Sequence, residues 1–200
     1  MGVTVPVPRS GSSRRCWLAA SYAGAAAFFA LEAVAREPGE ASDLAATGSD
    51  QGTTRQIVAA YGLAAGLSPV LRRLRAGRLP PVSGPAGVGM MAAGLALRAW
   101  SMRTLGAYYS RTLRTTSDQQ MVESGPYQVI RHPGYLGSIM VWTGLAVTSG
   151  SSAAAAGVTA LMGHAYGRRI AAEEAMLAGR FGSAYAEYSQ RTKRLIPFIW

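Results

Sequence analysis

The chain has 200 residues, enough for one domain, and 49% of them are hydrophobic while only 15% are Asp, Glu, Lys or Arg. This composition excludes a disordered chain, which needs low hydrophobicity and much charge. The net charge of +10 does not indicate a soluble nucleic-acid-binding protein, because long stretches carry no charge at all. The single cysteine, Cys16, excludes an internal disulfide and a multi-cysteine zinc site, and two histidines leave little for a metal. The composition therefore favours a membrane protein.

Three apolar stretches in the N-terminal half are candidate membrane segments. Residues 17–35 contain Glu32 as their one charged residue, and residues 56–71 and 79–97 contain none. A helix that spans the bilayer needs about 20 mostly apolar residues. The first and third stretches therefore qualify as spans, and the second is slightly short.

A longer uncharged stretch follows at residues 133–167. As one helix it would be about 52 Å long, too long for a hydrocarbon core of ~30 Å. We expect it to turn back at residues 148–152, which are rich in Ser and Gly, and to form a helical hairpin. The predicted fold class is an all-α integral membrane bundle of about five transmembrane helices, followed by a cytosolic amphipathic helix. The predicted division is residues 1–97 for the N-terminal transmembrane helices and residues 98–200 for the catalytic region.

Two glycine pairs are candidate helix contacts in the membrane. Gly62 and Gly66, and Gly163 and Gly167, fit the small-xxx-small pattern that lets helices approach closely. The alternative is that they reflect only the Gly- and Ala-rich composition of the chain.

The N-terminus has two interpretations. The segment Ser13–Leu18 loosely resembles a twin-arginine export signal, and Ala33–Ala35 resembles a cleavage site. However, the apolar stretch between them is longer than a usual signal core, and further apolar stretches follow. We therefore predict an uncleaved first helix.

The distribution of Lys and Arg predicts the orientation in the membrane. The loops 36–55 and 98–131 and the tail 168–200 together carry more Lys and Arg than the N-terminus and the loop 72–78. Because cytoplasmic loops are enriched in Lys and Arg, we place the C-terminus in the cytoplasm. A group of four arginines at residues 72–78 then lies on the opposite side, against this rule.

A polar segment before the hairpin contains the first candidate site residues. Pro133 biases His132 away from helix and suits the first position of the next helix. His132 therefore lies just before a helix N-terminus, where free backbone N–H groups suit a carboxylate. The alternative is a helix start anchored at the membrane surface by Tyr127 and Tyr135.

A second polar segment follows the hairpin. Arg169 and Glu173 are four residues apart and share one helix face directly after an apolar stretch. The alternative is that Arg168 and Arg169 are only positively charged membrane anchors. An amphipathic stripe that covers a pocket or packs against the bilayer comes next, at Leu177, Phe181, Tyr185 and Tyr188.

The order of these motifs resembles the isoprenylcysteine carboxyl methyltransferase family and its bacterial phospholipid-methyltransferase-like relatives. The resemblance covers roughly residues 98–198. The matching residues, in chain order, are Trp100, Thr104-Leu105-Gly106, Gly125-Pro126-Tyr127, Arg131-His132-Pro133, Tyr135, Gly137, Arg169, Glu173-Glu174, Leu177, Phe181-Gly182, Tyr185, Tyr188 and Arg194-Leu195-Ile196-Pro197.

The resemblance implies a membrane-embedded methyltransferase that uses S-adenosyl-L-methionine at a cytoplasmic site of the cell membrane. It implies catalytic roles for Arg169, which would hold an acceptor carboxylate, and for His132. The cofactor-binding residues it implies are Gln119, Gln120, Met121, Val122, Tyr127, His132, Pro133, Gly134, Tyr135 and Glu173.

The chemistry of these side chains agrees with that assignment. Glu173 would receive the ammonium group of the cofactor, and Tyr127 or Tyr135 would lie over its sulfonium or adenine. A carboxylate acceptor, with a pKa near 4, needs no general base at pH 7, and Arg169 would bind it bidentately. A phenol acceptor would need a base, for which His132 is the candidate. An amine or thiol acceptor also stays open.

The composition looks bacterial, so we expect a small lipophilic acid, an isoprenoid or a long-chain phenol as acceptor rather than a prenylated protein. Two other functions remain open. One is an NADPH-dependent membrane reductase of the sterol-reductase type, although Gly134 and Ser138 replace the Asn and Glu of its motif. The other is a non-catalytic membrane accessory protein.

Overall fold

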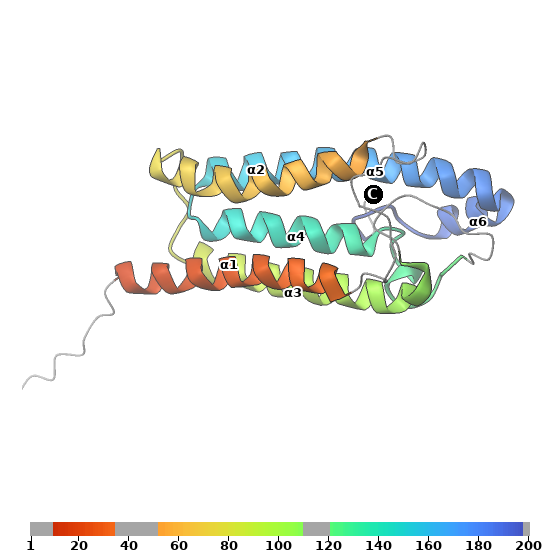
Figure 1. Ribbon diagram of the computed structural model, residues 1–200, viewed down its shortest axis with the longest axis horizontal. Coiled ribbons are helices and arrows are strands. Elements are labelled where there is room, and N and C mark those ends of the chain that lie inside the picture. The colour runs from red at the N-terminus through yellow and green to blue at the C-terminus, as the bar shows by residue number, and fades with distance from the viewer. Residues whose placement is uncertain (1–9, 35–51, 110–120, 198–200) are drawn as a thin grey trace, which may run out of the picture.

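The computed structural model describes residues 10–34, 52–109 and 121–197. Within these ranges the chain is helical, and no strand is present (Figure 1). The long helices are α1 (Ser10–Val34), α2 (Thr53–Arg73), α3 (Ser83–Leu105), α4 (Pro133–Thr148) and α5 (Ser152–Phe181). The short elements are the 3-10 turns η1 (Gly106–Tyr108) and η2 (Gly125–Gln128) and the helix α6 (Ser183–Arg191). The all-helical fold predicted from the sequence is confirmed.

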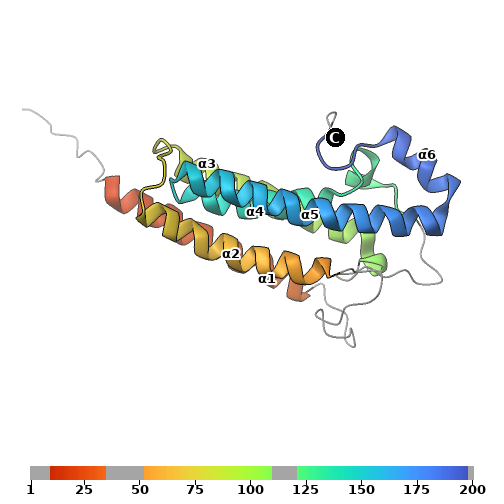
Figure 2. The same cartoon turned by 90° about the horizontal axis from the view of Figure 1, so that it is seen from above.

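The hairpin predicted for residues 133–167 is present. Between α4 and α5 the chain reverses over three residues, where Gly150 adopts a φ of +80° that favours glycine. Ser151 caps the second helix, because its side-chain oxygen accepts the backbone N–H of Ala154 at 3.2 Å. α5 then continues without a break to Phe181, so the apolar part of the hairpin and the polar segment after it form one rigid helix. α6 turns back from its end at Gly182 (Figure 2).

The number of membrane spans stays a prediction. Among the described helices, one segment, Ser13–Val34 of α1, combines the length and the mean hydropathy of a spanning helix. α3 runs through the boundary predicted between residues 97 and 98, so the two predicted regions share a helix.

α3 and α4 pack with their backbones in direct contact. A Cβ atom added at Gly94 would lie 2.6 Å from the carbonyl oxygen of Gly137, and one added at Gly144 would lie 2.6 Å from that of Gly87. No side chain larger than hydrogen fits at these positions, which is the small-residue packing typical of membrane helices.

The glycine pairs predicted to make such contacts do not make them. A Cβ atom at Gly62, Gly66, Gly163 or Gly167 would meet nothing within 4 Å. The prediction was wrong because the small-xxx-small spacing does not reveal which helix face is turned toward a neighbour.

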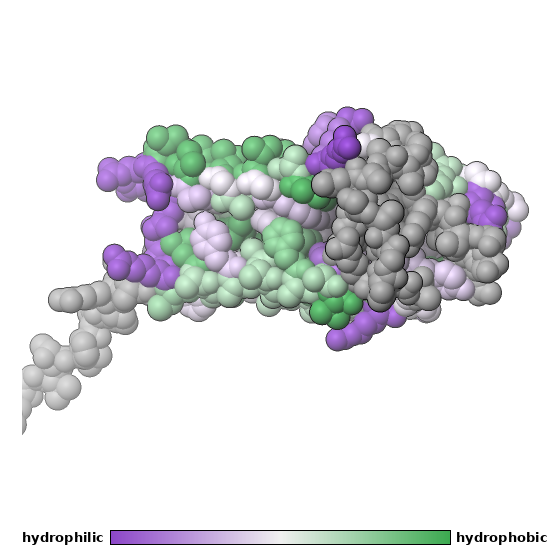
Figure 3. Space-filling model, in the orientation of Figure 1, coloured by the Kyte–Doolittle hydropathy of each residue, from purple (hydrophilic) through white to green (hydrophobic). Residues whose placement is uncertain are grey.

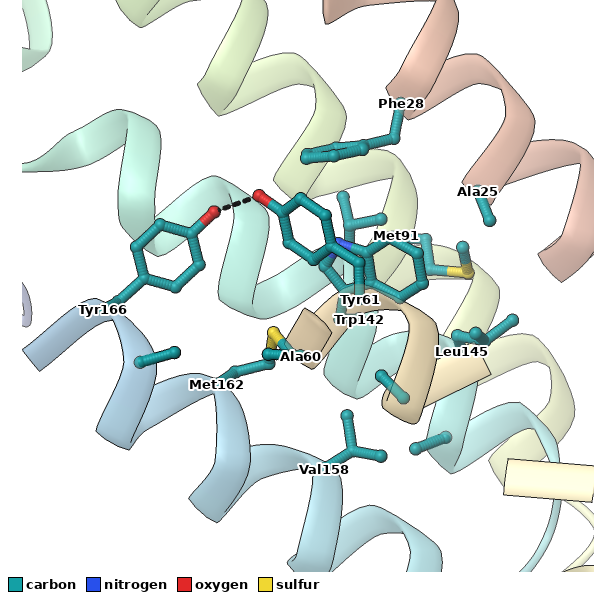
Figure 4. Close-up of a cluster of buried hydrophobic side chains, with 14 of the residues drawn as sticks. Ala25, Phe28, Ala60, Tyr61, Met91, Trp142, Leu145, Val158, Met162 and Tyr166 are labelled. Atoms are coloured by element: carbon teal, nitrogen blue, oxygen red, sulfur yellow. Dashed lines mark hydrogen bonds between the residues drawn. The ribbon is translucent and has the colours of Figure 1, made fainter. Parts of the chain in front are cut away.

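An aromatic cluster joins the helices at the centre of the bundle (Figure 4). The ring of Tyr61 on α2 stacks on Trp142 of α4 with centroids 4.8 Å apart, and Phe28 of α1 meets Tyr61 edge-on at 5.3 Å. The hydroxyl of Tyr61 also shares a hydrogen bond with that of Tyr166 on α5. Four helices are thus fixed around one point, directly beside the cavity described below.

The glycine contact predicts a stability effect. Gly94→Leu should lower the apparent melting temperature in detergent by roughly 2–12 °C, because overpacking costs about 1–3 kcal/mol and α3 would have to move away from α4. Gly163→Leu is the control, since its side chain would enter open space and leucine favours helix. Equal melting temperatures for the two variants would contradict the close α3–α4 contact.

Candidate active site

A cavity of about 680 Å³ lies at the end of the bundle where α1 ends and α2 begins. Its size is within the usual range for small-molecule sites. Residues of α1, α2, α3, η2, α4, α5 and α6 line it, so segments far apart in the sequence meet around it. The N-terminal helices contribute Glu32, Thr54 and Tyr61, although the sequence placed the site in residues 98–200 alone.

One tyrosine joins the two predicted halves of the site. The hydroxyl of Tyr135, in the first turn of α4, donates a hydrogen bond to Glu173 Oε2 on α5 at 2.6 Å. It also accepts a hydrogen bond from Arg169 Nε at 3.2 Å. Arg169 is 2% exposed and donates to the hydroxyls of Thr53 and Thr54, each at 3.0 Å, at the start of α2. α2, α4 and α5 are therefore connected through one guanidinium group.

His132 lies at the start of α4, as predicted. Its ring is buried and stacks on that of Tyr135, with the planes 4° apart. Its two ring nitrogens lie between two carboxylates, with Nδ1 3.7 Å from Glu173 and Nε2 3.4 Å from Glu174. Pro133 is the first residue of α4, which explains why the histidine backbone is not helical.

Glu174 holds the segment before α4 against the C-terminal segment. Arg131 Nε donates to its Oε1 at 2.9 Å, and Arg194 Nε donates to its Oε2 at 2.7 Å. Burial alone would raise the pKa of this carboxyl, but hydrogen bonds from His132 and Arg131 together with the charge of Arg131 lower it to about 2. Glu174 is therefore ionised at neutral pH and keeps this wall of the cavity assembled.

The backbone reinforces the same wall. The N–H of Arg131 donates to Lys193 O at 2.8 Å, and the N–H of His132 donates to Arg194 O at 3.1 Å. Tyr188 of α6 donates its hydroxyl to the carbonyl oxygen of Tyr127 at 2.8 Å. Burial raises the pKa of the Tyr127 phenol, so this side chain stays neutral.

A buried ion pair that the sequence analysis did not single out lies on the opposite wall. Arg98 Nε donates to Glu32 Oε1 at 2.5 Å, and its Nη2 donates to the hydroxyl of Tyr109 at 3.1 Å. Arg98 Nη1 donates to the carbonyl oxygen of Gly134 at 2.9 Å, so the pair also fixes the start of α4. The signals in the sequence were the lone charge of Glu32 within an apolar stretch and the arginine that ends another.

Most of the predicted site residues meet in this cavity. Those that line it are Met121, Val122, Tyr127, His132, Gly134, Tyr135, Arg169 and Glu173. Pro133 shapes the helix start but does not line the cavity, and Gln119 and Gln120 lie outside the described residues. The roles assigned to these residues stay predictions. Among the described residues, no three His, Cys, Asp or Glu side chains gather as a metal site.

One side of the cavity is apolar. Phe29 and Ala33 of α1 and Ile57 and Val58 of α2 line it, and Phe29 and Val58 are each half exposed on the outside of the bundle. The cavity therefore combines charged groups inside with an apolar margin at the surface between α1 and α2.

Comparisons with known proteins agree with this architecture. Protein-S-isoprenylcysteine O-methyltransferase of Xenopus laevis is 30% identical over 115 residues, which cover 56% of this chain and 40% of that protein. A probable protein-S-isoprenylcysteine O-methyltransferase of Oryza sativa subsp. indica is 29% identical over 56% of this chain and 60% of its own length. The chain thus aligns with 60% or less of these relatives.

A solved structure, that of the eukaryotic intramembrane Ras methyltransferase ICMT, has the same fold. The TM-score is 0.68 at 21% sequence identity, and the match covers 98% of this chain and 70% of that one. Residues 87–179, which contain α4 and most of α5, match the isoprenylcysteine carboxyl methyltransferase family. The resemblance to the isoprenylcysteine carboxyl methyltransferase family that the motifs predict is therefore confirmed over these residues.

Proposed function

We propose that this chain is an S-adenosylmethionine-dependent O-methyltransferase that methylates a carboxylate on a lipid-modified acceptor at the cytoplasmic side of the cell membrane. The observation that carries the proposal is the Tyr135 hydroxyl, which joins Glu173 to Arg169 in one cavity. An acidic group for a cationic donor and a basic group for an anionic acceptor thus lie side by side. The family match favours a methyltransferase over the reductase that the sequence left open.

The residues present fit the cofactor. Glu173 keeps a quarter of its side chain exposed and would bind an ammonium group, and the aromatic rings of Tyr127 and Tyr135 suit a sulfonium or an adenine. Tyr185 lines the same cavity, and its hydroxyl is buried close to the Glu174 carboxylate, so it is a further polar group within reach of a ligand. When bound, S-adenosylmethionine supplies an electrophilic methyl group.

Arg169 would hold the acceptor. A carboxylate is already ionised at pH 7, so the protein needs no base and has only to orient one oxygen. The Arg169 guanidinium lines the cavity and is fixed by Tyr135, Thr53 and Thr54, so it is preorganised for an anion. The positive charge of Arg98 on the opposite wall is already balanced by Glu32, so Arg169 is the arginine proposed for the acceptor.

The acceptor we propose carries an S-isoprenylated cysteine, because the relatives are named for that group. The apolar margin between α1 and α2 suits such a chain, which would enter from the bilayer beside Phe29 and Val58. The free small-molecule acceptor expected from the bacterial-looking composition has no support from these relatives.

The cofactor assignment is tested by calorimetry with S-adenosylhomocysteine on the protein in detergent. Glu173→Gln should weaken binding by about tenfold, because hydrogen bonds to charged groups contribute about 1.5–3 kcal/mol. Tyr185→Phe, which removes the hydroxyl alone, should weaken it by roughly twofold to tenfold. Glu187→Gln is the matched control, since this exposed glutamate of α6 does not line the cavity. Wild-type affinity in Glu173→Gln would refute the assignment.

The acceptor assignment is tested with N-acetyl-S-farnesylcysteine and methyl-labelled cofactor. Arg169→Gln should reduce methyl transfer by at least about 100-fold. The reason is that the variant loses roughly 3 kcal/mol from the charge-assisted hydrogen bonds that bind and orient the acceptor carboxylate. S-adenosylhomocysteine affinity should change far less. Arg168→Gln, an exposed neighbour on the same helix, should keep wild-type activity. Methylation of unprenylated N-acetylcysteine at an equal rate would rule out the lipid-modified acceptor.

A further inference from the structure

The end of the bundle opposite the cavity carries an unusual charge distribution. Six exposed arginines gather there from the start of α1, the end of α2 and the loop after it: Arg14, Arg15, Arg72, Arg73, Arg75 and Arg78. The surface at this end is strongly hydrophilic, in contrast to the apolar sides of the bundle (Figure 3). Every acidic residue within the described ranges lies instead toward the cavity end: Glu32, Glu123, Glu173, Glu174 and Glu187.

These arginines are held close together by the backbone. The loop after α2 is fixed on the turn between α4 and α5, because Ser151 Oγ donates to Ala76 O at 2.6 Å and the N–H of Leu79 donates to Gly150 O at 2.9 Å. The guanidinium of Arg14 packs against Gly150, where a Cβ atom would lie 3.6 Å from Arg14 Cζ. α1, α2 and the α4–α5 turn thus present their positive charges around one rim.

A second cavity of about 480 Å³ opens inside this rim. Arg72 and Arg73 line it together with Ser68, and its apolar lining includes Leu18 and Leu145. The hydroxyls of Ser68 and Ser149 already donate to Ala64 O at 2.8 Å and to Ala146 O at 2.6 Å. The donors left in the lining for an anion are the two guanidinium groups and the Tyr22 hydroxyl. Neither arginine forms an ion pair with a described residue.

The surface beside this cavity suits a lipid. Tyr22 and Val70 are about half exposed, at 46% and 48%, and Leu74 is 70% exposed. A ligand at this place would meet guanidinium groups with its polar part and apolar side chains with the rest. Guanidinium groups bind phosphate bidentately, and basic residues at a membrane surface attract anionic lipids.

We propose that the far-end cavity binds the phosphate headgroup of an anionic phospholipid through Arg72 and Arg73. A phospholipid fits better than free phosphate, because half of the lining is apolar and the sides of the bundle next to it are apolar as well (Figure 3). This site also explains why the arginines at residues 72–78 contradict the Lys and Arg rule for loops. Their positive charge is balanced by the lipid phosphate rather than by acidic side chains of the protein. This inference does not depend on the proposed enzymatic function.

The test uses the full chain in a neutral detergent and native mass spectrometry with added phosphatidylglycerol. We expect one phosphatidylglycerol molecule to be retained with much higher affinity than phosphatidylcholine. Arg72→Gln/Arg73→Gln should lose roughly 30-fold in this affinity, because each arginine near an anionic lipid contributes roughly fivefold. The melting temperature of this variant in detergent without added lipid should stay at the wild-type value, which shows that the variant is folded.

The matched control removes the same charge from the neighbouring loop. Arg75→Gln/Arg78→Gln should lower phosphatidylglycerol affinity by less than about threefold at physiological salt, because these arginines lie outside the cavity and are screened. An equal loss in both double variants would show diffuse charge attraction and overturn the proposed site. Equal retention of phosphatidylglycerol and phosphatidylcholine, or complete displacement of the lipid by inorganic phosphate, would also overturn it.

Discussion

The hydrogen bond between the Tyr135 hydroxyl and Glu173 is the contact on which the site depends. It joins α4 to α5 at 2.6 Å, and the hydrogen bond from Arg169 to the same hydroxyl brings in the start of α2. Buried charges are tolerated only when they are paired and hydrogen-bonded. Loss of this one hydroxyl would leave a carboxylate and a guanidinium face to face without their common partner. The arrangement of three helices around the cavity follows from that constraint.

Charge and length determined what could be predicted of the fold. The uncharged stretch at residues 133–167 exceeds the bilayer thickness, so a hairpin was its one compact solution, and α4 and α5 confirm it. Which helix faces pack together could not be predicted from the sequence, because several glycine pairs fit the small-xxx-small spacing. The glycines that α3 and α4 bring together, Gly94 and Gly137, are 43 positions apart in the printed sequence, and no local pattern relates them.

At the site, too, local signals could be recognised in the sequence, whereas contacts between distant segments could not. The four-residue spacing of Arg169 and Glu173 is a local signal, and so is the proline that follows His132. The structure places the side chains of Arg169, Glu173 and His132 in the cavity. The pairing of Arg98 with Glu32 joins α3 to α1, and only the folded chain shows it. A single charge within an apolar stretch was a sufficient reason to expect a partner, although it could not identify which one.

The internal pairing of arginines also changes how the loop charges should be counted. Arg98, Arg131 and Arg194 contribute to the excess that predicted a cytoplasmic C-terminus, yet all three bind carboxylates within the protein. Such arginines serve the cavity and have less charge to offer the membrane surface. The arginines at residues 72–78 have no acidic partner among the described residues, so their charge remains fully available at that surface. A count of Lys and Arg alone therefore overstates the contrast in available positive charge between the two ends, because it includes arginines that are paired within the protein.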